Sequence, residues 1–156
     1  MKVTSRILNT GESPLPLGDG WHPYFELGPL DKCKLTLPDS DRLILNEHII
    51  PTGEKEDFEL KDHLMSSMEL DDVFLLKNQG IGITKLSSNG KELSVWQNAD
   101  SGYKYIVVYT PGTRDKIAIE PLTCPPDSFN NKMDLMVLEP GDDVNLEFGV
   151  ELRVEK

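Results

Sequence analysis

The chain has 156 residues, a length that suits one domain with a single hydrophobic core. Hydrophobic residues make up 38% of it and charged residues 28%, a balance that argues against full disorder. Its 16 Lys and Arg stand against 27 Asp and Glu, which gives a formal net charge of −11. This acidity argues against nucleic acid and against anionic membrane surfaces as partners, because both require a basic face.

The sequence also bears on compartment and on metal binding. No apolar run approaches the roughly 20 residues of a membrane-spanning helix, and the first residues, MKVTSR, lack the apolar core of a signal peptide. We therefore expect a cytoplasmic protein. Cys33 and Cys124 are far apart and form no CxxC motif, so we expect two free thiols. The three histidines, His22, His48 and His63, have no ligand-like spacing, and no metal site is predicted.

Several segments have the pattern of β-strands. Residues 144–154 alternate between apolar and polar side chains, as a half-buried strand does. Residues 103–110, YKYIVVYT, are rich in aromatic and β-branched side chains and predict a central strand. The pair Asn89-Gly90 predicts a hairpin, because both residues tolerate positive φ; its strands are 81–87 and 92–97. Further short strands are predicted at 2–9, 33–37, 42–45, 116–120 and 135–138.

Helical signals are weak throughout the chain. The one helix candidate, residues 61–70, lacks a clean 3.6-residue period and is predicted to be a loop. The 11 prolines and 12 glycines lie between the strand-like runs, which is typical of short strands joined by turns. No repeat or Ser/Gly-rich linker divides the chain. We predict one antiparallel all-β domain over residues 1–156, a β-sandwich.

Residues 18–27, GDGWHPYFEL, form the first polar segment that a plain sandwich does not explain. His22 precedes a proline, which holds its backbone extended, and Trp21, Tyr24 and Phe25 surround it in the sequence. One interpretation is a core histidine with a single hydrogen bond. The other is an imidazole walled by aromatic rings and suited to proton transfer near neutral pH.

A second polar segment, ELDDVF at residues 69–74, contains adjacent carboxylates. Asp71 and Asp72 are open to two interpretations. They form a solvated turn, or they begin a strand in which neighbouring side chains point to opposite faces. In the second case one carboxylate enters a cleft while the other stays outside it.

The third segment, KIAIEPLTCPPDSFN at residues 116–130, is the most informative. An alternating strand ends at Glu120 and is followed by a stiff, proline-rich loop. A carboxylate held rigidly at a strand end suits a general base, although a surface glutamate at a strand terminus is the simpler alternative. Thr123 and Cys124 lie in the same loop, but no His–Asp set accompanies them to make either a nucleophile.

These segments together resemble the aldose 1-epimerase (galactose mutarotase) family. The matching stretches are GWHPYFEL (20–27), LDDVF (70–74), YTP (109–111) and IEPLTCPPDSFN (119–130), in the family's order. Each is weak alone, whereas the ordered set is specific. The resemblance implies that the chain corresponds to the C-terminal half of a family member. The Arg and the second His that the family carries in its N-terminal half have no match here.

The resemblance also implies a fold, an activity and a set of site residues. The fold is part of a galactose mutarotase-like β-supersandwich that binds sugar on a concave sheet face. The activity is interconversion of the α and β anomers of a free hexose by ring opening and closure, which needs no cofactor. The implied catalytic residues are His22 as general acid and Glu120 as general base. The implied substrate-binding residues are Asp71, Trp21, Tyr24 and Asn130.

Two other functions remain open from the sequence. One is a catalytically incomplete carbohydrate-binding module, and the other is a fragment without a sugar site. Sugar phosphates are disfavoured because the acidic chain offers no evident cationic clamp. The family often has His at the position of Asp72, so the role of that residue is left open. We also expect self-association into a homo-oligomer, because half of a supersandwich exposes strand edges.

Overall fold

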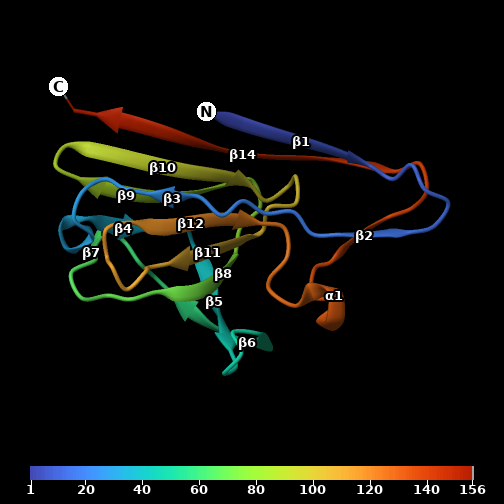
Figure 1. The fold of residues 1–156 in the computed structure, drawn as a ribbon, viewed down its shortest axis with the longest axis horizontal. Helices are drawn as coiled ribbons and strands as arrows, with labels where there is room; N and C mark the ends of the chain where they lie inside the picture. The colour runs from blue at the N-terminus through green and yellow to red at the C-terminus, as the bar shows by residue number, and fades with distance from the viewer. Residues whose placement is uncertain (156) are drawn as a thin grey trace.

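A computed structural model describes residues 1–155, which fold into two antiparallel sheets packed face to face (Figure 1). Sheet I has the strand order β1 (Lys2–Leu8), β14 (Asp143–Val154), β10 (Lys91–Asn98), β9 (Ile81–Ser88), β4 (Lys34–Thr36) and β7 (His63–Leu64). Sheet II has the order β3 (Tyr24–Phe25), β12 (Ile117–Leu122), β11 (Tyr105–Tyr109), β8 (Asp71–Leu76), β5 (Ser40–Leu45) and β6 (Pro51–Phe58). This architecture confirms the predicted antiparallel β-sandwich.

Four short elements complete the fold. Strands β2 (Leu15–Leu17) and β13 (Met136–Leu138) pair with each other as a separate ribbon at one end of the sandwich (Figure 1). A 3₁₀ turn, η1, covers Leu30–Lys32, and a single helical turn, α1, covers Ser128–Asn131.

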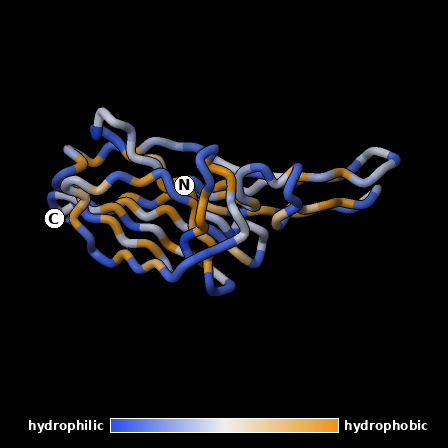
Figure 2. Tube along the Cα trace, turned by 90° about the horizontal axis from the view of Figure 1, so that it is seen from below, coloured by the Kyte–Doolittle hydropathy of each residue, from blue (hydrophilic) through white to orange (hydrophobic). Residues whose placement is uncertain are grey.

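The hydrophobic core lies between the two sheets. Hydrophobic and hydrophilic residues alternate along many of the strands (Figure 2), so these strands turn one face inward. Sheet I contributes Leu35, Leu86 and Val95 to the core, and sheet II contributes the larger set of Phe74, Ile106, Val108, Ile117 and Ile119, all almost fully buried. Sheet II also carries a smaller apolar cluster on its other face, centred on Leu43, Val73 and Tyr105.

Most of the predicted strands are confirmed. The hairpin of β9 and β10 turns at Asn89 and Gly90, with φ of 50° and 72°. Residues 61–70 contain no helix, as predicted, although β7 lies within them. The sequence missed β6, Pro51–Phe58, because six of its eight residues are exposed and it shows no apolar alternation. Both cysteines are free, Cys33 buried and Cys124 half-buried. Over residues 1–155, none of the helices has the length and apolar character to traverse a bilayer.

Candidate acid–base site

The register between β3 and β12 brings His22 and Glu120 together. Gly20 pairs with Leu122, and Tyr24 pairs with Ala118, in the same antiparallel register. His22 lies midway between Gly20 and Tyr24 along the chain, and Glu120 lies midway between their two partners. His22 is therefore directly opposite Glu120. A backbone hydrogen bond of 3.1 Å from the Trp21 amide to the Pro121 carbonyl secures this register.

The two side chains meet at the surface of sheet II. Nε2 of His22 lies 3.2 Å from Oε1 of Glu120, within hydrogen-bond reach. The Glu120 side chain is 9% exposed, whereas that of His22 is 55% exposed. Burial raises the pKa of the Glu120 carboxyl above its ordinary value, the positive charge of a protonated His22 opposes this effect, and the negative charge of Asp71 adds to it. Glu120 is therefore a stronger base than an exposed glutamate.

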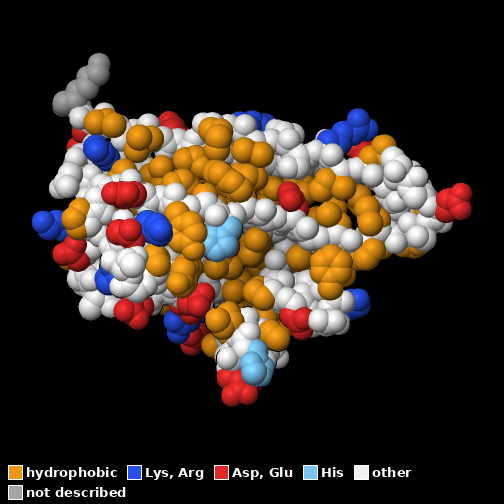
Figure 3. Space-filling model, in the orientation of Figure 1, with side chains coloured by type: hydrophobic (Ala, Val, Ile, Leu, Met, Phe, Trp, Pro, Cys, Tyr) orange, Lys and Arg blue, Asp and Glu red, His pale blue; other side chains and the backbone are white. Residues whose placement is uncertain are grey.

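A cavity of about 420 Å³ opens beside this pair. It is lined by His22, Ile49, Asp71, Val73, Val107, Tyr109, Glu120, Leu122 and Pro126. Val107 pairs with Glu120 on one side and with Val73 on the other, so these side chains form one row across the same face of sheet II. The floor is thus apolar, and the polar groups stand at its edge. Figure 3 shows a histidine bordered by hydrophobic side chains on the face toward the viewer.

The segments on either side of the cavity are held by specific hydrogen bonds. Asp19 and Thr123 bond reciprocally, with Asp19 N donating to Thr123 Oγ1 at 2.9 Å and Thr123 N donating to Asp19 O at 2.9 Å. The Tyr103 hydroxyl donates to Asp19 Oδ2 at 2.5 Å. In the proline-rich loop, Ser128 Oγ donates to the Pro125 carbonyl at 2.6 Å. These bonds fix the chain before His22 and the loop after Glu120.

Asp71 and Asp72 point to opposite faces of the sheet, as the strand interpretation predicts. Asp71 lines the cavity of the acid–base pair. Asp72 is turned away from it, half-buried, with an oxygen 3.8 Å from Arg42 Nη1. Burial raises the pKa of Asp72, and the charge of Arg42 opposes the shift. Only Asp71 is placed to contact a ligand beside Glu120.

The other expected sugar-binding residues lie outside the cavity lining. Trp21 packs against Phe148 and Phe25, with ring centroids 5.0 and 6.4 Å away, so it serves the core. The Tyr24 ring lies 5.0 Å from the His22 ring. Asn130 is exposed in α1 and donates a hydrogen bond to Asp127 Oδ1 at 2.5 Å. Of these residues, Tyr24 alone touches the acid–base pair.

Sequence reasoning missed Ile49, which lines the cavity from the turn between β5 and β6. Its φ is +60°, an unusual value for a β-branched residue. Asn46 holds this turn, because its Oδ1 accepts hydrogen bonds from the amides of His48 and Ile50 at 2.9 and 3.1 Å. An asparagine that bonds nearby amides is a turn signal, but only the fold shows that this turn reaches the site.

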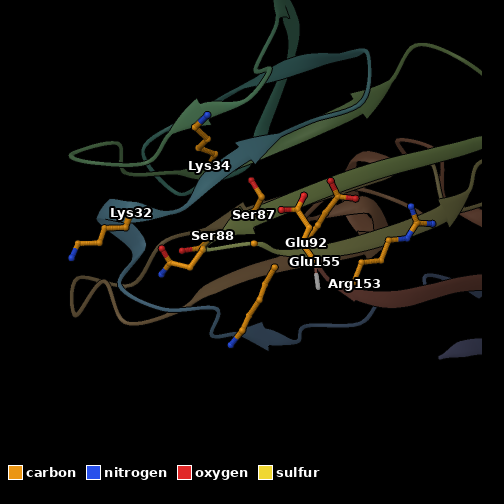
Figure 4. Close-up of a pocket in the computed structure, with 10 residues that line it drawn as sticks. Lys32, Lys34, Ser87, Ser88, Glu92, Arg153 and Glu155 are labelled. Carbon is orange, nitrogen blue, oxygen red and sulfur yellow. The ribbon is translucent and has the colours of Figure 1, made fainter.

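A larger hollow of about 570 Å³ lies at the turn between β9 and β10 (Figure 4). Its wall mixes cations with carboxylates, among them Lys32, Lys34, Glu92, Arg153 and Glu155, and it holds no imidazole. Across residues 1–155 there is no group of three or more His, Cys, Asp or Glu side chains arranged to hold a metal ion. The cavity at His22 and Glu120 is thus the candidate for acid–base chemistry.

Comparison with known proteins identifies the family. The sequence model of the aldose 1-epimerase family matches residues 1–151. The chain belongs to this family. It is 28% identical over 149 residues to the uncharacterized protein YihR of Escherichia coli K12, an alignment that covers 91% of this chain and 48% of YihR.

Solved aldose epimerase-like structures share the fold. A galactose mutarotase-like protein from Clostridium acetobutylicum superposes with a TM-score of 0.85 and 19% identity. This match covers 99% of the present chain and 52% of the C. acetobutylicum chain. A putative aldose 1-epimerase from E. coli K12 superposes with a TM-score of 0.73 and 20% identity. This match covers 99% of the present chain and 56% of the E. coli chain. The chain thus spans about half the length of the relatives it matches.

Proposed function

We propose that this chain interconverts the α and β anomers of a free hexose, with Glu120 as general base and His22 as general acid. The observation that carries the proposal is the 3.2 Å contact between Nε2 and Oε1 at the wall of a cavity. The two oxygens that exchange protons in mutarotation, the anomeric hydroxyl and the ring oxygen, are bonded to the same carbon. A base and an acid that touch each other can therefore serve both oxygens.

The chemistry balances without a cofactor. The Glu120 carboxylate takes the proton of the anomeric hydroxyl while protonated His22 gives one to the ring oxygen, and the C1–O5 bond breaks. The electrons of the O–H bond form the aldehyde C=O, and those of the C1–O5 bond remain on the ring oxygen. After rotation about C1–C2, neutral His22 takes the hydroxyl proton back and Glu120 returns its proton to the carbonyl oxygen. The ring closes on the other face, and both residues regain their starting states.

The electrostatics of the pair suit this exchange. Burial makes Glu120 more basic than an exposed glutamate, which brings its proton affinity closer to that of an imidazole. A general base whose pKa is raised toward the working pH takes up and returns a proton to the sugar more efficiently, as a reversible isomerisation requires. The exposed side of His22 leaves room for a sugar to enter between the pair and the solvent.

We assign sugar positioning to Asp71 and to the apolar floor. Asp71 lines the cavity together with the pair, and its carboxylate accepts hydrogen bonds from ring hydroxyls. Val107, which is half-buried in the cavity lining, contacts the apolar face of the pyranose. Tyr24 orients the imidazole that donates to the ring oxygen.

The second candidate function is sugar binding without turnover. It is favoured by the exposure of His22, because an acid in contact with water is less firmly positioned than a buried one. The two functions share the cavity and differ only in whether bound sugar exchanges anomers faster than free sugar.

Anomer exchange followed by NMR tests the proposal. The two H1 signals of glucose and of galactose are recorded with wild-type protein, Glu120→Gln and His22→Asn in one buffer. We expect catalysed exchange in the wild type and a loss of about 10²- to 10⁴-fold in each variant. Glu92→Gln and His48→Asn, which lie outside the cavity, serve as matched controls and retain activity.

The outcomes separate the two functions. Exchange that survives in Glu120→Gln and His22→Asn contradicts the acid–base assignment. Background exchange in the wild type, with line broadening that saturates as sugar is added, supports the binding module instead.

A further inference from the structure

Tyr109 lines the cavity beside the acid–base pair but takes no part in the proton transfers. It is half-buried and ends β11, on the face that also carries Val107 and Tyr105. The Tyr105 hydroxyl donates a hydrogen bond to Asp134, outside the cavity. Within residues 1–155, by contrast, the Tyr109 hydroxyl has no hydrogen-bond partner. It is therefore available to a ligand.

The strand register places Asp71 beside Tyr109. Tyr109 lies opposite Asp71 of β8 on one side and opposite Ala118 of β12 on the other. Side chains in directly opposite positions have Cβ atoms about 4.5–5.5 Å apart. Asp71 is exposed and lines the same cavity. The two residues thus form an adjacent polar pair on the cavity wall.

The hydrogen-bonding capacities of the two side chains are complementary. An ionised carboxylate such as that of Asp71 only accepts hydrogen bonds, whereas the phenol of Tyr109 has an O–H to donate. A sugar hydroxyl can both donate and accept. Two neighbouring hydroxyls of a pyranose therefore match this pair, because one donates to Asp71 while the other accepts from Tyr109.

The distance from Glu120 to this pair suits one sugar ring. Glu120 lies opposite Val107, two residues before Tyr109, so Tyr109 is its diagonal neighbour. Diagonal neighbours are about 7–8 Å apart, an interval that a pyranose and its hydroxyls can bridge. Asp71 is also close enough for its negative charge to raise the pKa of Glu120. Val107 lies beneath this interval as part of the cavity floor.

The orientation of the sugar follows from the chemistry at its reducing end. The proposed function places the bond between C1 and the ring oxygen at Glu120 and His22. In a six-membered ring, the bond between C3 and C4 lies directly across from that bond. The hydroxyls at C3 and C4 therefore point toward Tyr109 and Asp71.

We propose that Tyr109 and Asp71 form a diol clamp that binds the C3 and C4 hydroxyls of the hexose and determines which sugars the site accepts. This inference rests on the proposed function, because the position of C1 decides which hydroxyls reach the clamp. Removal of either hydroxyl leaves one member of the clamp without its partner in the complex, so sugars that lack one are bound more weakly.

Sugar affinities measured by NMR titration test the clamp. The sugars are glucose and four deoxy analogues, which lack the hydroxyl at C2, C3, C4 or C6. We expect the wild type to bind the C3 and C4 analogues about 3- to 10-fold more weakly than glucose, and the other two about as well as glucose. Tyr109→Phe keeps the ring and loses the discrimination against one of the C3 and C4 analogues. Asp71→Ala loses the discrimination against the other.

Tyr105→Phe is the matched control for Tyr109→Phe. It removes a hydroxyl from the same face of the same strand, but one that bonds to Asp134 outside the cavity. We expect it to retain the wild-type order of affinities. If Tyr109 had only a structural role, Tyr109→Phe would weaken the binding of all five sugars by the same factor, and that result overturns the clamp.

Anomer exchange recorded on the same samples separates the clamp from the proposed catalysis. Catalysed exchange with equal affinities for all five sugars overturns the clamp and leaves the acid–base assignment standing. Discrimination confined to C2 or C6 overturns the clamp as well. Discrimination at C3 and C4 without catalysed exchange supports the clamp and overturns the catalytic role alone. A wild type that binds no sugar overturns both.

Discussion

The backbone amide of Trp21 lies 3.1 Å from the carbonyl oxygen of Pro121, to which it donates a hydrogen bond. This bond joins two segments that are distant in sequence and holds the register that sets His22 opposite Glu120. The acid–base pair is thus a cross-strand neighbour pair, and its geometry depends on the close approach of two backbones.

Gly20 allows the close approach beside the pair. A Cβ at this position overlaps the side chain of Leu122, which lines the cavity. We expect Gly20→Ala to push Leu122 aside and to lower the rate of anomer exchange by about 10- to 100-fold, because small displacements of positioned groups are costly in rate. We expect Gly20→Ala to remain folded, because the flexible end of the Leu122 side chain can rotate away from the added methyl group.

The double variant with Leu122→Ala provides the control for Gly20→Ala. It removes the overlap, and we expect it to recover most of the rate relative to Leu122→Ala alone. Equal rates for the wild type and Gly20→Ala would contradict the role of this close approach.

The charge of Asp71 tunes the base. Because Asp71 raises the pKa of Glu120, Asp71→Asn lowers that pKa. The acid limb of the rate profile, where Glu120 becomes protonated and inactive, then moves to lower pH. Exchange rates measured across acidic pH in the wild type and Asp71→Asn check this shift. Asp72→Asn, which alters the carboxylate on the other face, leaves the limb in place. A limb that shifts upward or stays fixed in Asp71→Asn contradicts the assignment.

Glu120 is predicted to lower the stability of the native state at neutral pH. Its folded-state pKa lies above its ordinary value of 4.5 because burial disfavours the charged form. The protonated form is thus favoured by folding, and its contribution is complete below pH 4.5 and lost as the pH rises through the folded-state pKa. We therefore expect Glu120→Gln, which is neutral at every pH, to melt at a higher temperature than the wild type at neutral pH. The two melting temperatures converge in acid, and a Glu120→Gln protein that melts lower at neutral pH would refute this account.

Trp21 is predicted to stabilise the fold without binding sugar. Trp21→Leu removes the contacts with Phe25 and Phe148 and lowers the free energy of unfolding by about 1–3 kcal/mol, measured in urea. Sugar affinity of the folded protein stays unchanged. A large loss of sugar affinity in Trp21→Leu would contradict this prediction and show that Trp21 contributes to sugar binding.

Tyr24→Leu is expected to affect catalysis rather than stability, because Tyr24 is exposed and orients His22. It slows anomer exchange with little loss of stability.

Local sequence patterns were sufficient to predict much of the fold. Alternation over residues 144–154 reports burial of one face, and Asn89-Gly90 reports a turn that requires positive φ. Both signals act over a few neighbouring residues. The exposed strand β6 was missed because an edge strand with water on most sides needs no apolar alternation, and alternation was the signal used to predict strands.

The sequence by itself determined the residue types of the site, an extended histidine before proline and a glutamate at a strand end. Only the tertiary structure decided that these two meet, because the register of β3 on β12 joins segments that carry no local record of each other. The pairing of β8 with β11 likewise turned Asp71 toward the cavity, and the contact of Trp21 with Phe148 is also one between distant segments. Leu152 and Val154 are exposed although their alternation predicted burial, because alternation does not report what packs over a face. Local pattern fixes which face a side chain takes along its strand, whereas the pairing of distant strands decides what that face meets.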